Sequence, residues 1–230
     1  MLLLGNTVTL NLLIGFVFSV VCLVFLDPIL YVFGASNETL PYARSFMQII
    51  LLGNMVTHMY FGMNAVLRAA SKPRQAMNAT IFTVLMNILL DSVFILWWGW
   101  RIRGAAVATV SSQSMALMYQ LKLFMNKQQL LHFKRGIYRL RKDLVSNIIS
   151  VGVSPFLMNL CACLIVIFMN NQLVRYGGDL SVGSYGIANA ISTIFLMFVI
   201  GVNQGMQPIA GYNYGSQQLD RLIKVLQLAI

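Results

Sequence analysis

The sequence predicts an all-α integral membrane protein, a polytopic bundle of about six transmembrane helices followed by the start of a seventh. The composition is 58% hydrophobic and only 10% charged. The mean hydropathy is +0.75, far above that of soluble domains. The chain also contains several uncharged runs of about 20 residues or more, the length that crosses the hydrocarbon core of a bilayer.

Six segments meet that length. The predicted spans are residues 7–33, 43–67, 75–98, 104–124, 147–174 and 182–206, and a seventh helix begins after Leu219. The Gly-Gly-Asp run at 177–179 is a predicted turn between two of them. The uncharged run after this turn is too long for one helix, so Gly201, Gly205 and Pro208 are predicted to end or bend it.

The net charge of +10 is distributed unevenly. Twelve of the 16 Lys and Arg residues follow the second, fourth or sixth predicted span, and the other four are Arg44, Arg101, Arg103 and Arg175. An excess of basic residues marks the cytoplasmic side of a membrane protein. We therefore expect a multi-pass protein of the cell inner (plasma) membrane, with the chain start and the 126–146 loop in the cytoplasm. The same distribution argues against nucleic acid as a partner.

Residues 126–146 form the longest break between predicted spans, and apolar residues alternate there with Lys and Arg. This pattern is typical of an amphipathic segment lying on anionic membrane lipid. A plain cytoplasmic linker between two lobes explains it equally well, and the two interpretations are compatible.

Asp91 is the strongest candidate for a functional residue. It is the only ionisable group in the 26 residues 75–100, and a carboxylate near the middle of a membrane span costs roughly 3 kcal/mol. Asn87, Thr83 and Thr80 lie on the same helical face and form a polar stripe with it. A structural hydrogen bond to a neighbouring helix is the alternative interpretation.

The fourth span places small residues at every fourth position, a pattern that lets another helix approach closely. These residues are Gly104, Ala108, Ser112 and Ala116. Thr109 and Gln113 share the adjacent face. Because a short loop joins the third and fourth spans, we expect them to be antiparallel neighbours, with Thr109 at the depth of Asp91.

Asn64 ends the second span on the same face as Thr57. A coupling role and a packing role for Asn64 are equally supported by this spacing. An intramembrane histidine such as His58 can relay protons, but packing is the more common role. The three cysteines lie within apolar spans without metal-ligand spacing. No catalytic motif or cofactor-binding motif is present, so no enzyme activity is expected.

Five stretches of sequence, taken in their order and spacing, resemble the multidrug and toxic compound extrusion (MATE) family. They are NAVLRAASKPRQAM, NILLD, GAAVATVSSQ, VGVSPFLMNL and GVNQGMQPIAGYNYG. The resemblance covers nearly the whole chain, from the family's third helix to the start of its ninth, and is nearest to the bacterial, MepA-like drug-exporter branch.

The resemblance implies two six-helix lobes around a central cavity, with alternating access driven by protons or sodium ions. Residues 1–126 would be the remainder of the first lobe, 127–146 a basic cytoplasmic linker, and 147–230 the start of the second lobe, so the chain is expected to be a fragment. The positions that match the family's cation-coupling network are Asn64, Asn87, Asp91 and Thr109, with a possible Na⁺ at Asp91. The expected substrates are amphipathic, often cationic drugs.

Two departures from the family pattern affect the coupling prediction. The family's first-helix aspartate falls outside this sequence, and residues 144–174 contain no acid where another branch has a seventh-helix glutamate. Two rival functions also stay open. A lipid-linked oligosaccharide flippase would need a cationic cavity, and no Arg or Lys is expected inside the spans. A non-transporting membrane scaffold is the second rival.

Overall fold

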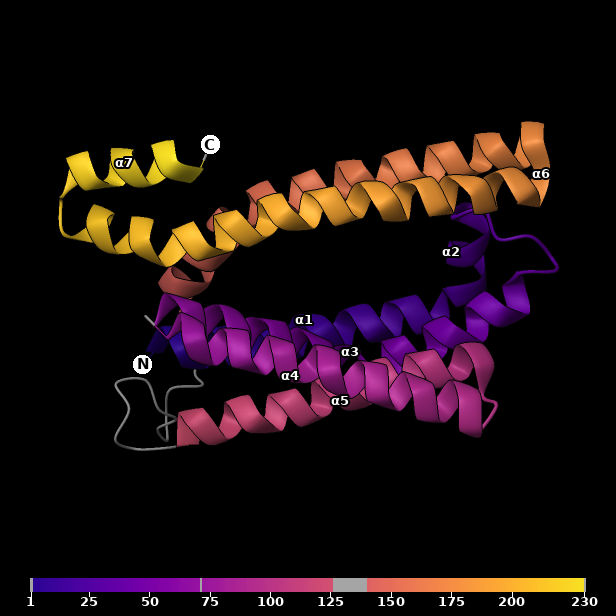
Figure 1. Cartoon of the computed structure of the whole chain (residues 1–230), viewed down its shortest axis with the longest axis horizontal. Coiled ribbons are helices and arrows are strands. Elements are labelled where there is room, and N and C mark those ends of the chain that lie inside the picture. Colours follow the sequence, from indigo (N-terminus) through magenta and orange to yellow (C-terminus); the bar gives the residue numbers. More distant parts are fainter. Residues whose placement is uncertain (1, 71, 126–139, 230) are drawn as a thin grey trace.

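The computed structural model describes residues 2–70, 72–125 and 140–229, and every regular element in these ranges is helical (Figure 1). The elements are α1 (Leu2–Val24), α2 (Leu26–Val32), α3 (Leu40–Ala69), α4 (Pro73–Asp91), the π-helix η1 (Ser92–Trp97), α5 (Arg101–Met125), α6 (Lys142–Gly215) and α7 (Leu219–Ala229). The all-α class is confirmed. Most of the predicted linker, residues 127–139, lies outside the described residues.

Five helical stretches are long and apolar enough to cross a membrane. They are Leu2–Val24, Leu40–Ala69, Pro73–Trp97, Lys142–Gly178 and Leu180–Gly215. Helix α5 forms where the fourth span, 104–124, is predicted and has a comparable length of 25 residues, but it is more polar. Its polar residues Ser112 and Gln120 are fully buried. Helix α5 therefore presents polar groups to the inside of the bundle, which lowers its hydropathy.

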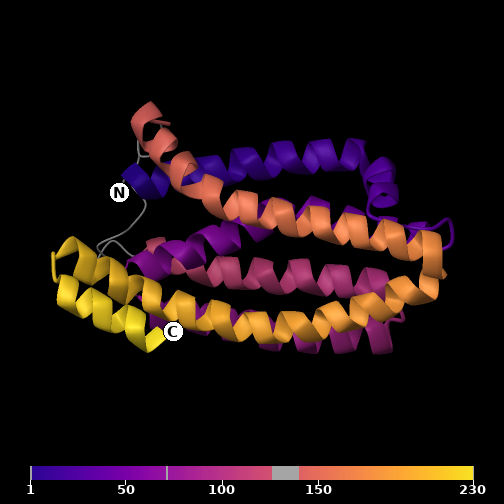
Figure 2. The ribbon, with the colours of Figure 1, turned by 90° about the horizontal axis from the view of Figure 1, so that it is seen from above.

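Gly178 divides α6 into two antiparallel halves. The helical hydrogen bonding of α6 covers 74 residues, but Gly178 has a φ of 68° and a ψ of −175°. A positive φ is readily adopted by glycine, and here it turns the chain back along itself (Figure 2). The turn predicted at 177–179 is thus confirmed. The predicted end of the helix at 201–208 is wrong, because α6 continues through Pro208 to Gly215; a bend at these residues stays a prediction.

The prediction that residues 7–33 form a single helix is also wrong. Helix α1 ends at Val24, and the short helix α2 turns away from it towards α6 (Figure 1). Asn170 and Asn171 of α6 donate side-chain hydrogen bonds to Phe33 O (3.1 Å) and Val32 O (2.8 Å). These contacts hold the end of α2 against the first half of α6.

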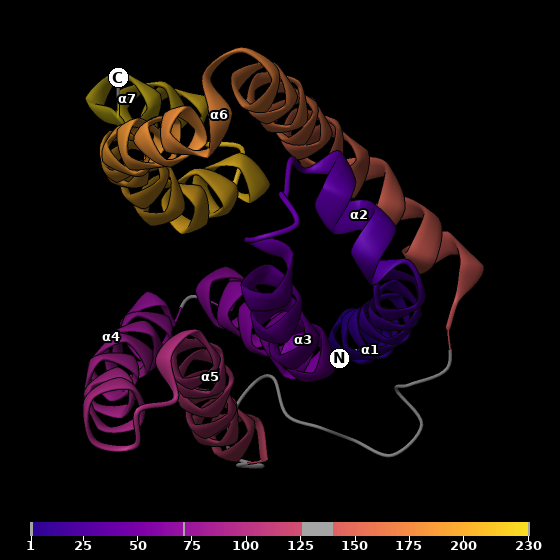
Figure 3. The ribbon, with the colours of Figure 1, turned by 90° about the vertical axis from the view of Figure 1, so that its right-hand side faces the viewer.

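Helices α1, α3, α4 and α5 form one group, and α6 with α7 lies beside it (Figure 3). The core between α1 and α3 contains Leu4, Val8, Met59 and Met63. Both halves of α6 keep their apolar side chains largely exposed, as expected for helices that meet lipid or further helices. The short turns after α2, after η1 and at Gly178 lie at one end of the molecule, and the α3–α4 and α6–α7 turns lie at the other (Figure 1).

The small residues predicted to allow close packing of α5 are all buried, from Gly104 to Ala116. Helix α5 packs closely on α3 at Gly53, where an added Cβ would overlap the methyl groups of Val110 on α5 and lie 3.0 Å from the Val110 Cβ. Valine has little rotamer freedom on a helix, so the backbones themselves would have to separate.

We therefore expect Gly53→Ala to destabilise the chain by about 1–3 kcal/mol, because overpacking forces α3 away from α5. Thermal unfolding in detergent measures the change. Gly152→Ala on α6 is the matched control, since a Cβ there meets nothing within 4 Å. It should be neutral or stabilising by up to about 1 kcal/mol. Equal effects of the two variants would contradict the close packing of α3 and α5.

Candidate functional site

Asp91 is the last residue of α4 and lies directly before η1. The π-helix η1 continues α4 to its C-terminal end at Trp97, and π-helical turns are frequent at functional sites. Asp91 and Asn87 are both half-buried. The Asp91 Oδ1 and Asn87 Nδ2 atoms are buried, and neither has a hydrogen-bond partner among the described residues. Unsatisfied buried polar atoms are rare in native proteins, so this pair is the central feature of the candidate site.

The register of α4 and α5 places Thr109 near Asp91 in depth. A Cβ added to Gly104 would lie 3.1 Å from Phe94 O, so the start of α5 packs directly on η1. Helices α4 and α5 are antiparallel (Figure 1). Asp91, three residues before Phe94, is therefore at the same depth as position 107, three residues after Gly104. Thr109 then lies within one turn of Asp91, and its hydroxyl donates to Ala105 O in its own helix (2.9 Å).

Asn64 does not join this group. It is 4% exposed, and its Nδ2 donates to Ala76 O (3.0 Å) and Thr80 Oγ1 (3.2 Å) at the start of α4. Asp91 lies 11 residues beyond Thr80, which is about 16 Å along a helix. The four predicted coupling residues therefore occupy two separate places, with Asn64 at one end of α4 and Asp91, Asn87 and Thr109 at the other.

The polar stripe of α4 connects these places, but only half of it has partners. Thr80 meets Asn64, and one turn further Thr83 donates to Tyr60 Oη (3.1 Å). Asn87 and Asp91 follow at the next two turns with their buried atoms unpaired. Helix α3 thus satisfies the first two positions of the stripe and leaves the last two open.

Helix α3 also bonds to its other neighbours. Thr57 Oγ1 donates to Gln113 Oε1 on α5 (2.6 Å), and Asn54 Nδ2 donates to Ser19 Oγ on α1 (3.0 Å). His58 lies against α1, where a Cβ added to Gly15 would be 3.4 Å from its Cδ2. This contact favours the packing role for His58.

Arg68 is not among the predicted coupling residues, although the structure places it beside Asn64. Its basic charge places it with the loop that follows α3, but it lies within α3 and donates through Nη1 to Asn64 Oδ1. Its Nε is buried without a hydrogen-bond partner among the described residues. Arg68 is the next-to-last residue of α3, so its charge lies at the end of the span. The spacing of four residues predicts that Arg68 and Asn64 share one helical face.

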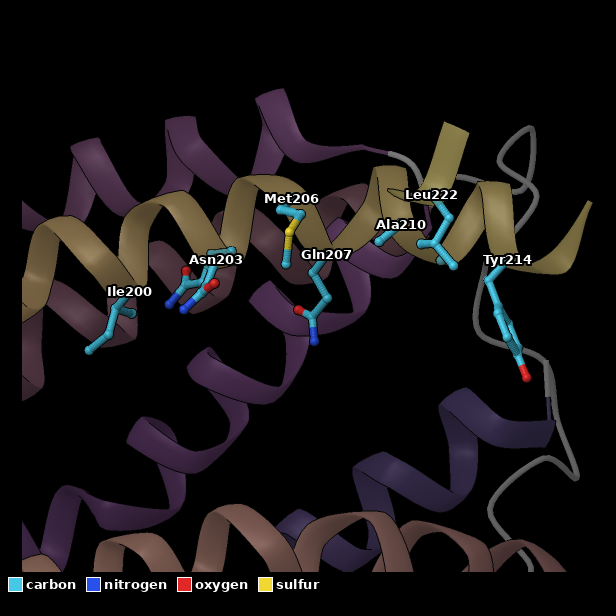
Figure 4. A pocket seen from close by; sticks show the side chains of 9 residues that line it. Ile200, Asn203, Met206, Gln207, Ala210, Tyr214 and Leu222 are labelled. Atoms are coloured by element: carbon cyan, nitrogen blue, oxygen red, sulfur yellow. The ribbon is translucent and has the colours of Figure 1, made fainter. Parts of the chain in front are cut away.

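A cavity of about 600 Å³ lies along the last part of α6 and the start of α7. Ile200, Asn203, Gln207 and Tyr214 project from the same side of α6 into it (Figure 4). This volume suits a drug-sized ligand. None of the predicted coupling residues lines it. Within the described chain, no three His, Cys, Asp or Glu side chains cluster as metal ligands.

Antiparallel helices of membrane length, with polar groups directed into the bundle, define a multi-pass membrane protein. Residues 2–93 and 151–230 match the MatE family model. Because these segments make up well over half of the sequence, the chain belongs to the MatE family of membrane transporters. It belongs to no enzyme class.

The matching relatives are drug exporters. The multidrug export protein MepA of Staphylococcus haemolyticus (strain JCSC1435) is 28% identical over 222 residues, covering 96% of this chain and 49% of the relative. The MATE multidrug transporter DinF-BH, solved as a complex with a bound compound, matches with a TM-score of 0.84 and 29% identity over 99% of this chain and 56% of that chain.

A MATE structure in complex with Br-NRF has a TM-score of 0.75 and 20% identity, over 98% of this chain and 54% of that one. At this identity the likeness concerns the fold alone. The chain spans about half the length of the curated relatives it matches.

The hydrogen bonds of Asn64 lead to a stability prediction. Asn64→Leu should destabilise the chain by about 1–3 kcal/mol, because it removes the bonds from Asn64 to Ala76 O and Thr80 Oγ1 and leaves the Arg68 Nη1 without its partner. Thr80→Val should cost less, since Asn64 keeps its bond to Ala76 O. Thermal unfolding of both variants in detergent measures the difference. A larger loss in Thr80→Val would show that Asn64 does not hold α3 against α4.

Proposed function

We propose that this chain forms part of a cation-coupled multidrug antiporter that works by alternating access. The observation that carries the proposal is the unpaired Asp91–Asn87 pair at the end of an otherwise satisfied polar stripe. A carboxylate inside a membrane span is costly and by default functional. The names of its relatives, multidrug export protein and multidrug transporter, support the substrate class.

Either a proton or a sodium ion can serve as the coupling ion at Asp91. A proton converts Oδ1 from an unpaired acceptor into a neutral donor. A sodium ion requires several oxygen ligands, and the Asp91 carboxylate, the Asn87 amide oxygen and the Thr109 hydroxyl are the candidates at this depth. No other cofactor is proposed.

Ion binding at Asp91 would act on the packing of α4 and η1 against α5. The charge of Asp91 sits where the α-helical turns widen into the π-helix, and Phe94 contacts α5 one turn away. An ion shifts the equilibrium between inward-facing and outward-facing states only if it binds the two states with different affinities. We propose that the arrangement of η1 on α5 supplies this difference.

The substrates we propose are amphipathic, often cationic drugs, bound in a cavity between two lobes. Residues 1–126 belong to the first lobe, 127–146 to the basic linker and 147–230 to the second lobe. The membrane is the cell inner (plasma) membrane, with the chain start, the 126–146 loop and the α3–α4 and α6–α7 turns in the cytoplasm. This orientation rests on the excess of basic residues in these segments.

The orientation is tested by cysteine labelling in a background without Cys22, Cys161 and Cys163. A cysteine at Asn37, in the turn before α3, should react with an impermeant maleimide added to whole cells. A cysteine at Gln218, in the turn before α7, should react only after the cells are opened. Both positions are exposed, so access depends on the side of the membrane. The reverse pattern would overturn the orientation.

The coupling role of Asp91 is tested in a transporter of the relatives' full length that contains this chain. Asp91→Asn keeps the size and most hydrogen bonding of the side chain but removes its charge. Drug-evoked cation exchange in proteoliposomes should fall by about tenfold or more, while membrane abundance and drug binding persist. Thr109→Ala should lose less, because it removes one hydroxyl and no charge.

Chemical labelling separates the two ions in the same protein. A hydrophobic carbodiimide modifies protonated carboxyl groups in apolar surroundings, so it should label Asp91 and leave the exposed Asp143 unmodified. Protection by Na⁺ at fixed pH indicates a sodium site, and protection only by raised pH indicates a proton site. Normal transport by Asp91→Asn would show that the carboxylate is structural.

A further inference from the structure

A second polar region lies between the two groups of helices, away from Asp91. Two cavities of about 400 and 530 Å³ separate α3 and α4 from the second half of α6, and Arg68 lines both. We refer to these two cavities together as the Arg68 cleft. Arg74 and Thr80 line it from α4, and Gln204 and Gln207 line it from α6.

The Arg68 guanidinium is held in position but is not neutralised. Nη1 donates to Asn64 Oδ1, and Asn64 is fixed in turn by its bonds to Ala76 O and Thr80 Oγ1. The buried Nε has no hydrogen-bond partner among the described residues. None of the residues lining the two cavities is acidic. The cleft therefore contains a positioned cation with unused donors and no carboxylate beside it.

The opposite wall leaves room for a ligand. Gly201 and Gly205 of α6 line the smaller cavity, and a Cβ added to either would meet no other atom within 4 Å. Met77 and Ala76 provide apolar surface in the same cavity, and Gln204 provides an amide. A group with a negative head and an apolar portion matches this lining.

We propose that the Arg68 cleft binds the oxyanion head, a phosphate or carboxylate, of an amphipathic ligand. The planar guanidinium presents a fork of N–H donors that matches the paired oxygens of such groups. Arg74 adds a second positive charge, and the partial burial of Arg68 strengthens the attraction relative to open water. The site is separate from Asp91 and has the opposite charge, so it does not depend on the proposed coupling ion or on a cationic drug.

The test measures anion binding to the purified chain in a neutral detergent. The probes are phosphatidylglycerol, zwitterionic phosphatidylcholine and inorganic pyrophosphate, and native mass spectrometry with thermal unfolding reports their binding. Arg68→Gln removes the charge and keeps a side-chain donor for Asn64. Gly205→Leu puts an apolar side chain into the cleft and leaves the Arg68 side chain itself unchanged.

Two matched controls accompany these variants. Lys122→Gln removes one positive charge that lines a different cavity, between α4 and α5. Gly183→Leu adds the same side chain to α6 where an added Cβ also meets nothing within 4 Å, and Gly183 does not line the cleft.

We expect the wild-type chain to bind phosphatidylglycerol more tightly than phosphatidylcholine. Arg68→Gln and Gly205→Leu should each weaken that binding by about tenfold or more, the usual effect of losing a charge-assisted contact. Both controls should bind as the wild type. If pyrophosphate competes with phosphatidylglycerol, the site accepts free phosphate. If pyrophosphate does not compete, the site is specific for a lipid headgroup. Either result supports an oxyanion site.

Three results would overturn the proposal. One is equal affinity for the two lipids. The second is a loss in Arg68→Gln without a loss in Gly205→Leu, which would place the anion outside the cleft. The third is an equal loss in Lys122→Gln, which would indicate general attraction to the basic surface.

Discussion

Polar groups inside an apolar helix bundle must find their partners within the bundle, because lipid supplies none. Helix α3 provides most of these hydrogen-bond partners. It hydrogen-bonds through Asn54 to α1, through Thr57 to α5, and through Tyr60 and Asn64 to α4. These four residues follow one another along a single helix, so the relative positions of α1, α4 and α5 all depend on α3.

The same constraint explains why the unsatisfied atoms are informative. In the polar stripe of α4, α3 provides partners for Thr80 and Thr83. Asn87 Nδ2 and Asp91 Oδ1, further along the stripe, have no hydrogen-bond partner among the described residues. At the opposite end of the stripe, the buried Arg68 Nε has no hydrogen-bond partner among the described residues. An unpaired cation and an unpaired anion about four turns apart on neighbouring helices cannot neutralise each other. Each end is thus available to a different kind of ligand.

Periodicity in the sequence was enough to place the long helices, the polar stripe of α4 and the small-residue face of α5, because these features depend on residues of one helix. The turn at Gly178 was also predictable, since two adjacent glycines interrupt an apolar run. The break at Phe25 also has a signal in the sequence, because Pro28 cannot donate to the carbonyl of Val24, four residues earlier. The direction of α2 was not predictable, since it depends on contacts with α6, over 130 residues away. The separation of Asn64 from Asp91 could not be predicted either, because it depends on how two helices pack. Spacing along α3 and α4 does not reveal which turns of the two helices lie side by side.

The two halves of α6 are attached very differently. The first half is tied to α1 where the Arg141 amide donates to Asn6 Oδ1 (2.9 Å), and to the end of α2 through Asn170 and Asn171. The second half faces α3 and α4 across the Arg68 cleft and is joined to the first at Gly178. The second half can therefore be regarded as a rigid arm that pivots at Gly178. An arm of 36 residues is about 54 Å long, so a rotation of about 10° at Gly178 would sweep its far end through about 9 Å. A single pair of backbone dihedrals is therefore sufficient to open or close the space in front of Arg68.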